Sequence, residues 1–407
     1  MNYAIKISDN FLKAAAVCLV LSGCIESFEP QGVDFKSALV VEATITDQNK
    51  HQEIFITRTF PLDTTGIYGE SDAQVQVLDS NGGVFEFEDK GQGRYESRNP
   101  FATEANVGYQ LDILTKDGER FKSTEEIAPM PTKIDSIYAE RDFKDGGAEE
   151  GIFVYVDSNQ PNSPNTNYQF TFEETYKIIA PYWSPEEAYV ISRVPFNYKV
   201  GKFLREQEER ICYNTVPSVE IIQENTAQYE ENKISKFPVR FLSRNNWILK
   251  HRYSILIKQV VQSSEAYSYY NSLASLSSAS NSLYQIQTGF LEGNIYSESN
   301  GENIVGYFQV SSVDEKRIYF KYEDFFPGEE PLGYESDCEL VTPLLNDIGG
   351  GSYLAYGIDE DLFTFYRWNE DYQGSNFNTP MIMAMPSSCG DCTHLGNNVP
   401  PDFWIEE

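Results

Sequence analysis

The chain has 407 residues, of which 41% are hydrophobic, so it is long enough for two or three folded domains and is not a disordered polypeptide. Its formal net charge of −31 at pH 7 repels the phosphates of nucleic acids and anionic lipid surfaces, which excludes DNA or RNA binding as its function. The aromatic content of 14% is typical of strands and of recognition surfaces.

The N-terminus has the pattern of a lipoprotein signal peptide over residues 1–23. Lys6 and Lys13 provide a positive flank, and residues 11–21 form an apolar run that is too short to span a membrane. The run ends in Leu-Ser-Gly before Cys24, whose sulfur is the atom that lipoprotein processing alkylates. We therefore predict that the mature chain begins at Cys24 and that its acyl chains hold it on a membrane. The alternative is an ordinary signal peptide followed by a chance cysteine.

Residues 24–37 contain Pro and Gly without a regular period, and we expect a tether there. In residues 38–130, short alternating runs such as 39–45 and 84–88 predict about seven strands separated by turns. This spacing is typical of an immunoglobulin-like β-sandwich. Pro-Met-Pro at 129–131 marks the boundary to the next domain.

Residues 131–407 are expected to form a larger C-terminal β-sandwich domain, so the predicted class of the whole chain is all-β. Within it, 151–156, 168–173 and 247–261 have strand patterns, and 157–167 is expected to be a long polar loop.

One helix is predicted in this domain, packed on a sheet. Ser263 and Ser264 are good N-caps, and Glu265 would lie in the first turn. Tyr267 and Tyr270 follow at helical spacing and would give the helix a narrow apolar stripe.

Cysteines are interpreted as an anchor and as disulfides. Cys18 is lost with the signal peptide, and Cys24 is the lipidation site. An exported chain matures in oxidising surroundings, so the other four are disulfide candidates with three possible pairings: Cys212, Cys338, Cys389 and Cys392. The CxxC spacing of the last two is also that of a zinc half-site. We favour disulfides and predict no metal site.

No catalytic residue and no cofactor is predicted. The three histidines, His51, His251 and His394, stand in no nucleophile or metalloenzyme motif. Carboxylates are too numerous for the sequence to select a glycosidase pair. Asp157 begins an oxygen-rich segment that lacks EF-hand spacing, so a solvated loop fits better than a calcium site.

Four tyrosines form the remaining candidate site. Tyr267, Tyr269, Tyr270 and Tyr284 could line a ligand groove, and they equally fit a helix that packs on a sheet. The ligand-binding residues are therefore left open.

Several segments resemble a family named only as domain of unknown function 4249. They are residues 39–47, Pro131 with 134–137, 293–297 with 305–312, and 389–393 with 400–404. The resemblance covers nearly all of the mature chain. It implies an outer-membrane lipoprotein of a Gram-negative bacterium that is paired with a TonB-dependent, SusC-like receptor. It implies no activity for particular residues.

We therefore expect a non-catalytic, lipid-anchored outer-membrane lipoprotein on the cell surface. It would dock on an outer-membrane β-barrel, a TonB-dependent transporter, as a substrate-capture or capping partner. Two alternatives are a structural accessory subunit of an envelope machine for outer-membrane protein assembly or secretion, and a hydrolase with dispersed catalytic residues. The periplasmic face is the alternative location.

Overall fold

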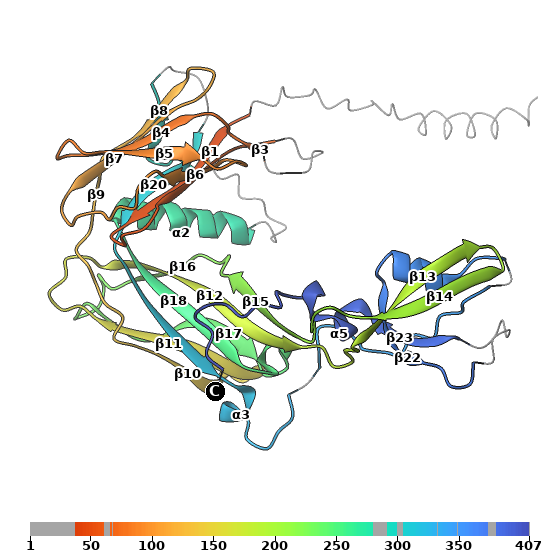
Figure 1. The fold of residues 1–407 in the computed structure, drawn as a ribbon. Helices are drawn as coiled ribbons and strands as arrows, with labels where there is room; N and C mark the ends of the chain where they lie inside the picture. Colours follow the sequence, from red (N-terminus) through yellow and green to blue (C-terminus); the bar gives the residue numbers. More distant parts are fainter. Residues whose placement is uncertain are drawn as a thin grey trace, which may run out of the picture.

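Three β-rich parts make up the protein, which is represented by a computed structural model (Figure 1). The structure describes residues 37–60, 66, 68–279, 291–298, 304–331, 333–347, 349–372 and 380–406. Strands predominate in these ranges, so the predicted all-β class is confirmed. The described helices are all too short or too polar to cross a bilayer.

The N-terminal sheet has 11 strands. They are β1 (Leu39–Thr46), β2 (Glu53–Arg58), β3 (Tyr68–Gly69), β4 (Gln74–Asp79), β5 (Val84–Asp89), β6 (Arg94–Ser97), β7 (Gly108–Leu114), β8 (Arg120–Ser123), β9 (Glu126–Ile127), β19 (Ile295–Ser297) and β20 (Ile304–Ser311). Its main path runs β19-β8-β7-β4-β5-β6-β2-β1-β20. Since the first and last strands of this path also lie against each other, the sheet is nearly closed around one core.

Alternation explains why β1 lies where it does. Leu39, Val41 and Ala43 point into the core and are buried, whereas Glu42, between Val41 and Ala43, is exposed. On one side β1 pairs with β2 in an antiparallel hairpin. On the other side it pairs in parallel with β20, a strand more than 250 residues later in the chain. The N-terminal sheet is thus completed by strands from the region that the sequence analysis assigned to the C-terminal domain.

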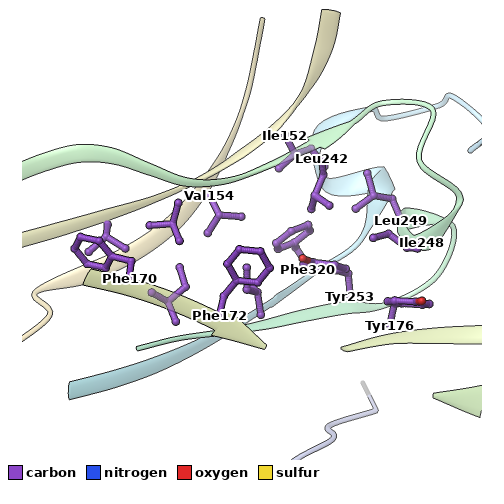
Figure 2. Packing of buried hydrophobic residues seen from close by; sticks show 14 of the residues in the cluster. Ile152, Val154, Phe170, Phe172, Tyr176, Leu242, Ile248, Leu249, Tyr253 and Phe320 are labelled. Carbon is purple, nitrogen blue, oxygen red and sulfur yellow. The ribbon is translucent and has the colours of Figure 1, made fainter. Parts of the chain in front are cut away.

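Two facing sheets form a β-sandwich below the N-terminal sheet. One contains β10 (Ser136–Lys144), β11 (Glu149–Asn159) and β17 (Lys233–Ser243). The other contains β12 (Asn167–Ile179), β15 (Ile211–Pro217), β16 (Ile222–Asn225), β18 (Tyr253–Gln262) and β21 (Val313–Phe320). Figure 2 shows how Ile152, Val154 and Leu242 from the first sheet face Phe170, Phe172 and Tyr253 from the second.

One ion pair crosses this apolar core. Arg240 of β17 donates from Nε and Nη2 to the two carboxylate oxygens of Glu174 on β12, at 3.0 and 2.9 Å. The hydroxyl of Tyr253 donates to the same carboxylate at 2.6 Å. A bidentate pair with a further donor satisfies a charge that burial would otherwise make costly.

The predicted helix is α2 (Ser264–Ala279), and it lies between the N-terminal sheet and the sandwich, where it contacts β12, β18 and β20 (Figure 1). The described residues also form three short helices that the sequence did not predict: α3 (Tyr322–Phe325), α4 (Tyr353–Asp359) and α5 (Ser387–Gly390).

A small lobe projects from the sandwich (Figure 1). We define the lobe as the hairpin of β13 (Glu186–Val194) and β14 (Asn197–Leu204), helix α4, and the hairpin of β22 (Phe363–Trp368) and β23 (Ile382–Pro386). These elements share a small separate core, which includes Val200, Leu354 and Phe365.

Two expected boundaries change in the sandwich. The strand predicted for residues 247–261 begins at Tyr253, because Asn246 caps a short 3-10 helix, η1 (Trp247–Leu249), by accepting the N–H of Ile248. The loop expected from 157 to 167 begins after Asn159, because β11 continues to pair with β17 through that residue.

Candidate functional site

A groove of about 900 Å³ lies between the outer face of the N-terminal sheet and α2. The sheet contributes the outward side chains of β1, β2 and β20, and the sandwich contributes Gln169 and a loop at 219–221. The residues from α2 are Tyr269, Tyr270 and Leu273. The groove therefore lies where three segments that are distant in sequence meet.

Local capping places α2 against this groove. The Oγ of Ser263 accepts the N–H of Ala266 at 3.1 Å, which satisfies one free donor of the first turn. Ala266 and Tyr269 are the buried residues of the first turns. The helix prediction is confirmed, but the buried stripe starts one residue before the predicted one, so Tyr267 is only partly buried.

Two of the predicted tyrosines form a cluster with a third that sequence reasoning did not select. The ring of Tyr269 lies 5.3 Å from that of Tyr270 and 5.2 Å from that of Tyr307 on β20. Tyr270 is also hydrogen bonded to Thr44, and burial raises the pKa of Tyr270 to about 12. The hydroxyl of Tyr270 is therefore neutral at physiological pH and can donate or accept. Tyr284 lies outside the described residues.

A buried carboxylate, Glu126, fixes the base of this cluster. Its Oε1 accepts the hydroxyl of Tyr307 at 2.8 Å and Nδ2 of Asn294 at 3.0 Å, and its Oε2 accepts the hydroxyl of Ser263 at 3.2 Å. Burial raises the pKa of Glu126, and the hydrogen bonds oppose that shift only in part. The sequence offers no signal for this site, because its partners lie more than 130 residues away from Glu126.

The structure does not bring the three histidines together. His51 lines the groove, and its Nδ1 lies 2.7 Å from the carbonyl oxygen of Ser97. His394 lies at the root of the lobe, 3.4 Å from a carboxylate oxygen of Asp361. His251 lines a second hollow of about 740 Å³ in the sandwich. The histidines thus lie in three different environments.

The second hollow is lined by both basic and acidic side chains. Lys177, Lys250 and Glu406 line it together with His251. Burial, with smaller contributions from Lys250 and Lys177, lowers the pKa of His251 to about 4. The imidazole is therefore neutral at physiological pH.

Asp157 has its carboxylate occupied by protein donors. It accepts the N–H of Lys236 at 2.6 Å and the hydroxyls of Ser136 at 3.1 Å and Tyr138 at 3.4 Å. Asp157 therefore belongs to β11, and the oxygen-rich loop begins only after Asn159. Across the described ranges, no group of three or more His, Cys, Asp or Glu side chains is placed to hold a metal ion.

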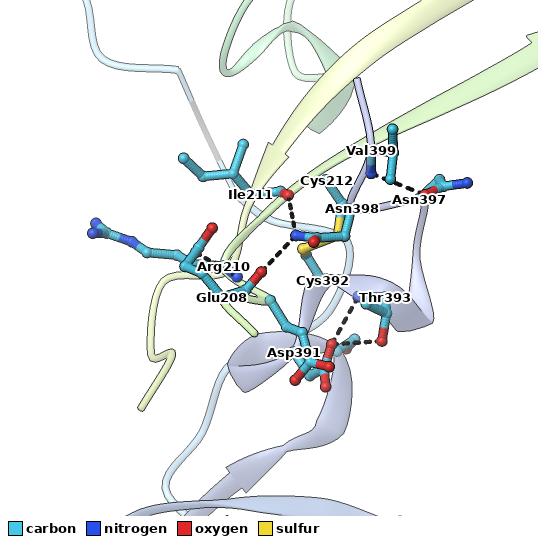
Figure 3. Close-up of a disulfide and its surroundings, with 12 residues drawn as sticks. Glu208, Arg210, Ile211, Cys212, Asp391, Cys392, Thr393, Asn397, Asn398 and Val399 are labelled. Carbon is cyan, nitrogen blue, oxygen red and sulfur yellow. Dashed lines mark hydrogen bonds between the residues drawn. A yellow bond between two sulfur atoms is a disulfide. The ribbon is translucent and has the colours of Figure 1, made fainter. Parts of the chain in front are cut away.

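All four predicted disulfide candidates are paired. Cys212 of β15 bonds to Cys392 of η2 (Cys392–His394), and Figure 3 shows how this bridge ties the sandwich to the root of the lobe. Cys338 bonds to Cys389 of α5. The zinc alternative is wrong for this structure, because the pairing leaves no thiolate at the CxxC. Cys24 lies outside the described residues.

Arg205 forms ion pairs at the root of the lobe, the region where β13 and β14 meet the segment around Asp391 and Cys392. Its guanidinium contacts the carboxylates of Glu187 and Glu209 and lies 2.9 Å from that of Asp391. Asp391 also accepts the N–H and hydroxyl of Thr393 at 2.8 and 2.6 Å, and its pKa falls because these bonds and Arg205 outweigh burial. One mostly buried cation thus connects the lobe to the segment just before β15 and to the segment that holds Cys392.

Comparison with known proteins identifies the family of this chain. A family model described as domain of unknown function (DUF4249) matches residues 25–317. No curated protein matches the chain. A solved structure of a DUF4785 family protein from Legionella pneumophila has 10% identity and a TM-score of 0.18 to this chain, covering 54% of this chain and 52% of its own. The match thus spans about half the length of that protein.

Proposed function

This chain belongs to the family of domain of unknown function 4249, and from that premise we propose that it is a non-catalytic, lipid-anchored outer-membrane protein that docks on a β-barrel. The barrel is a TonB-dependent transporter, and this protein is its substrate-capture or capping partner. The groove between the N-terminal sheet and α2 is the observation that carries the proposal.

The groove has the size and lining of a capture site. Its volume of about 900 Å³ lies within the range of about 300–1,000 Å³ that is usual for small-molecule sites. Tyr269 and Leu273 offer apolar surface, and Tyr270, Gln169 and Glu42 offer polar groups that can orient a ligand. A ligand held here would contact all three segments that build the groove.

Chain length supports an anchored position for this groove. Residues 24–37 span at most about 45 Å when fully extended. A lipid on Cys24 would therefore keep β1, which forms one wall of the groove, within that distance of the bilayer. A barrel in the same membrane would then be within reach.

The anchor is tested by two matched substitutions in the full chain, Cys24→Ser and Cys18→Ser. Cys18→Ser lies in the segment that processing removes, so it should leave membrane localisation and barrel co-purification unchanged. Cys24→Ser should abolish both. Equal behaviour of the two variants would contradict the proposal, and a co-purified barrel without a plug and a TonB box would favour outer-membrane protein assembly instead of transport.

Capture is tested separately by filling the groove. Glu42→Trp places a large ring on the outer face of β1, where the native side chain is exposed. We expect barrel binding to persist and barrel-dependent nutrient uptake to fall. Glu88→Trp, on an exposed position of β5, is the control and should change neither.

A further inference from the structure

The hairpin of β13 and β14 turns an apolar face to solvent. Ala188 and Val200 are buried in the lobe core on its inner face. Tyr189, Ile191 and Phe203 point the other way and are 45%, 55% and 48% exposed. Such a set of large apolar side chains on one small element is typical of an interaction site and not of an isolated surface residue.

These outward side chains are contiguous. The ring of Tyr189 lies 6.1 Å from that of Phe203 on the neighbouring strand. Gly201 pairs with Tyr189, and a Cβ at that glycine would come within 2.9 Å of the side chains of both Tyr189 and Ile191. Tyr189 and Ile191 therefore cover the backbone of Gly201 and form one patch with Phe203.

The tip of the hairpin is apolar and strained. Val194 pairs with Asn197, so Pro195 and Phe196 form a two-residue turn. Phe196 has φ of 61°, a conformation for which a turn normally uses Gly or Asn, and its side chain is 59% exposed. One edge of the Phe196 ring lies beside Gly350, where an added Cβ would come within 2.9 Å of it, and the rest of the ring faces solvent. A bulky residue kept at positive φ with more than half of its side chain exposed points to a role outside folding. We call Tyr189, Ile191, Val194, Phe196 and Phe203 together the hairpin surface.

The hairpin is also basic on a strongly acidic protein. The hairpin has two acidic residues, Glu186 and Glu187, at its base, and beyond them residues 188–204 contain Arg193, Lys199 and Lys202 and no acidic residue. The whole chain has 31 basic and 62 acidic residues. Arg193 pairs with Asp359, and Lys202 pairs with Glu186. Within the ranges that the structure describes, Lys199 has no ion pair.

The root of the lobe presents the hairpin surface rigidly. The bridge between Cys212 and Cys392 and the contacts of Arg205 connect the hairpin to the sandwich. A preorganised element loses little conformational entropy when it binds. Rigidity therefore favours binding to a defined partner.

We infer that the hairpin surface is the docking surface for a protein partner that presents an apolar strip bordered by carboxylates. Exposed Tyr, Phe and Arg side chains are the residues that dominate the buried centres of protein interfaces, and the basic border of the hairpin selects an acidic counterpart. This inference rests on the proposed function, because the partner is the same β-barrel.

Charge argues against two other occupants. Two copies of this chain that met through their hairpins would bring like charges together, and each body carries a formal charge near −31. An anionic bilayer would repel the same body. A protein surface with locally placed carboxylates can match the hairpin without meeting the rest of the chain.

Photocrosslinking in intact cells tests the location of the contact. p-Benzoylphenylalanine replaces Phe203 in one full-length variant and Phe143, which is 55% exposed on the sandwich, in the control. We expect a covalent adduct with an integral β-barrel protein from position 203 and not from position 143.

Affinity for that purified barrel then tests the energetic contribution. The double variant Ile191→Ser, Phe203→Ser should bind about thirtyfold more weakly, as expected when central aromatic and aliphatic contacts are lost. The control Val84→Ser, Phe143→Ser removes side chains of similar exposure and should stay within about twofold. Circular dichroism verifies that both variants fold.

Distinct results separate failure of this inference from failure of the proposed function. A barrel that co-purifies equally well with the hairpin variant overturns the inference and leaves the proposed function standing. The absence of any barrel partner for the native chain overturns both. An adduct between two copies of this chain, or hairpin-dependent binding to vesicles of phosphatidylethanolamine and phosphatidylglycerol without a barrel adduct, also overturns the inference.

Discussion

Arg205→Met should loosen the lobe, because Arg205 is the cation that three carboxylates share at its root. The side chains of Arg205, Glu187 and Asp391 are 10%, 20% and 12% exposed, so removal of the cation leaves largely desolvated negative charges unpaired. Loss of one partner from such a pair typically costs about 3 kcal/mol. Arg193→Met is the control, since Arg193 and Asp359 are 58% and 38% exposed, and such a pair contributes about 0–1 kcal/mol.

Native-state amide hydrogen exchange measures this effect where it occurs. A loss of about 3 kcal/mol in the opening free energy speeds exchange roughly a hundredfold or more in β13, β14 and β22. The protected amides of the sandwich should keep their exchange rates. If Arg205→Met changes exchange in the lobe no more than Arg193→Met does, the charged root does not hold the lobe and this account of its rigidity is wrong.

Four further variants test the remaining structure. Replacing Cys212 and Cys392 together by Ser should lower the free energy of unfolding by about 2–4 kcal/mol in a denaturant titration, because the bridge closes a loop of 180 residues; an unchanged midpoint would refute this role. Glu126→Ala should destabilise by about 2 kcal/mol, because it leaves three donors unpaired. Glu126→Gln should stabilise the protein at pH 7. Burial raises the pKa of Glu126, so the native carboxyl contributes stability at pH below 4.5, and this contribution is lost as the pH rises through the folded pKa. Melting curves recorded across this pH range should lack that dependence in the variant. The pKa of His251 is lowered from 6.5 to about 4, so the unfolded state binds the proton more readily and the stability should fall as the pH drops from 6.5 to 4. His251→Gln should flatten this part of the curve of stability against pH. An NMR titration midpoint near 6.5 would contradict the burial of the ring.

Local features of the fold could be predicted from the sequence. The antiparallel hairpin of β1 and β2 follows from two alternating runs and a polar turn, and the turn before β8 has Gly118 at a positive φ of 87°, which glycine adopts readily. The helix after Ser263 follows from its cap. Each of these depends on residues that are close in the chain.

Long-range features could not be predicted in the same way. The parallel pairing of β1 with β20 requires glycine at position 306, where φ is +139° and a Cβ would lie 2.0 Å from the carbonyl oxygen of Val41. A glycine in the sequence does not, however, indicate which strand will pair with its own. The choice among three disulfide pairings also depends on the tertiary fold. Tyr307 lines the groove, and Glu126 accepts its hydroxyl, only because two distant segments meet there.

The hairpin of β13 and β14 could have been predicted from the sequence. Two alternating runs flank a Pro-Phe turn at residues 195–196, a pattern that indicates a β-hairpin. The sequence does not tell which face of such a hairpin is covered. That depends on the packing of α4 and β22 against β13, which only the structure supplies.

Native mass spectrometry of the chain, extracted from its own membrane in mild detergent, tests the central claim most directly. The account predicts a complex of one β-barrel with one chain that begins at Cys24 and carries the added mass of its acyl groups. A chain of 46.4 kDa with its first 23 residues intact, without acyl groups and without a barrel partner, would contradict it.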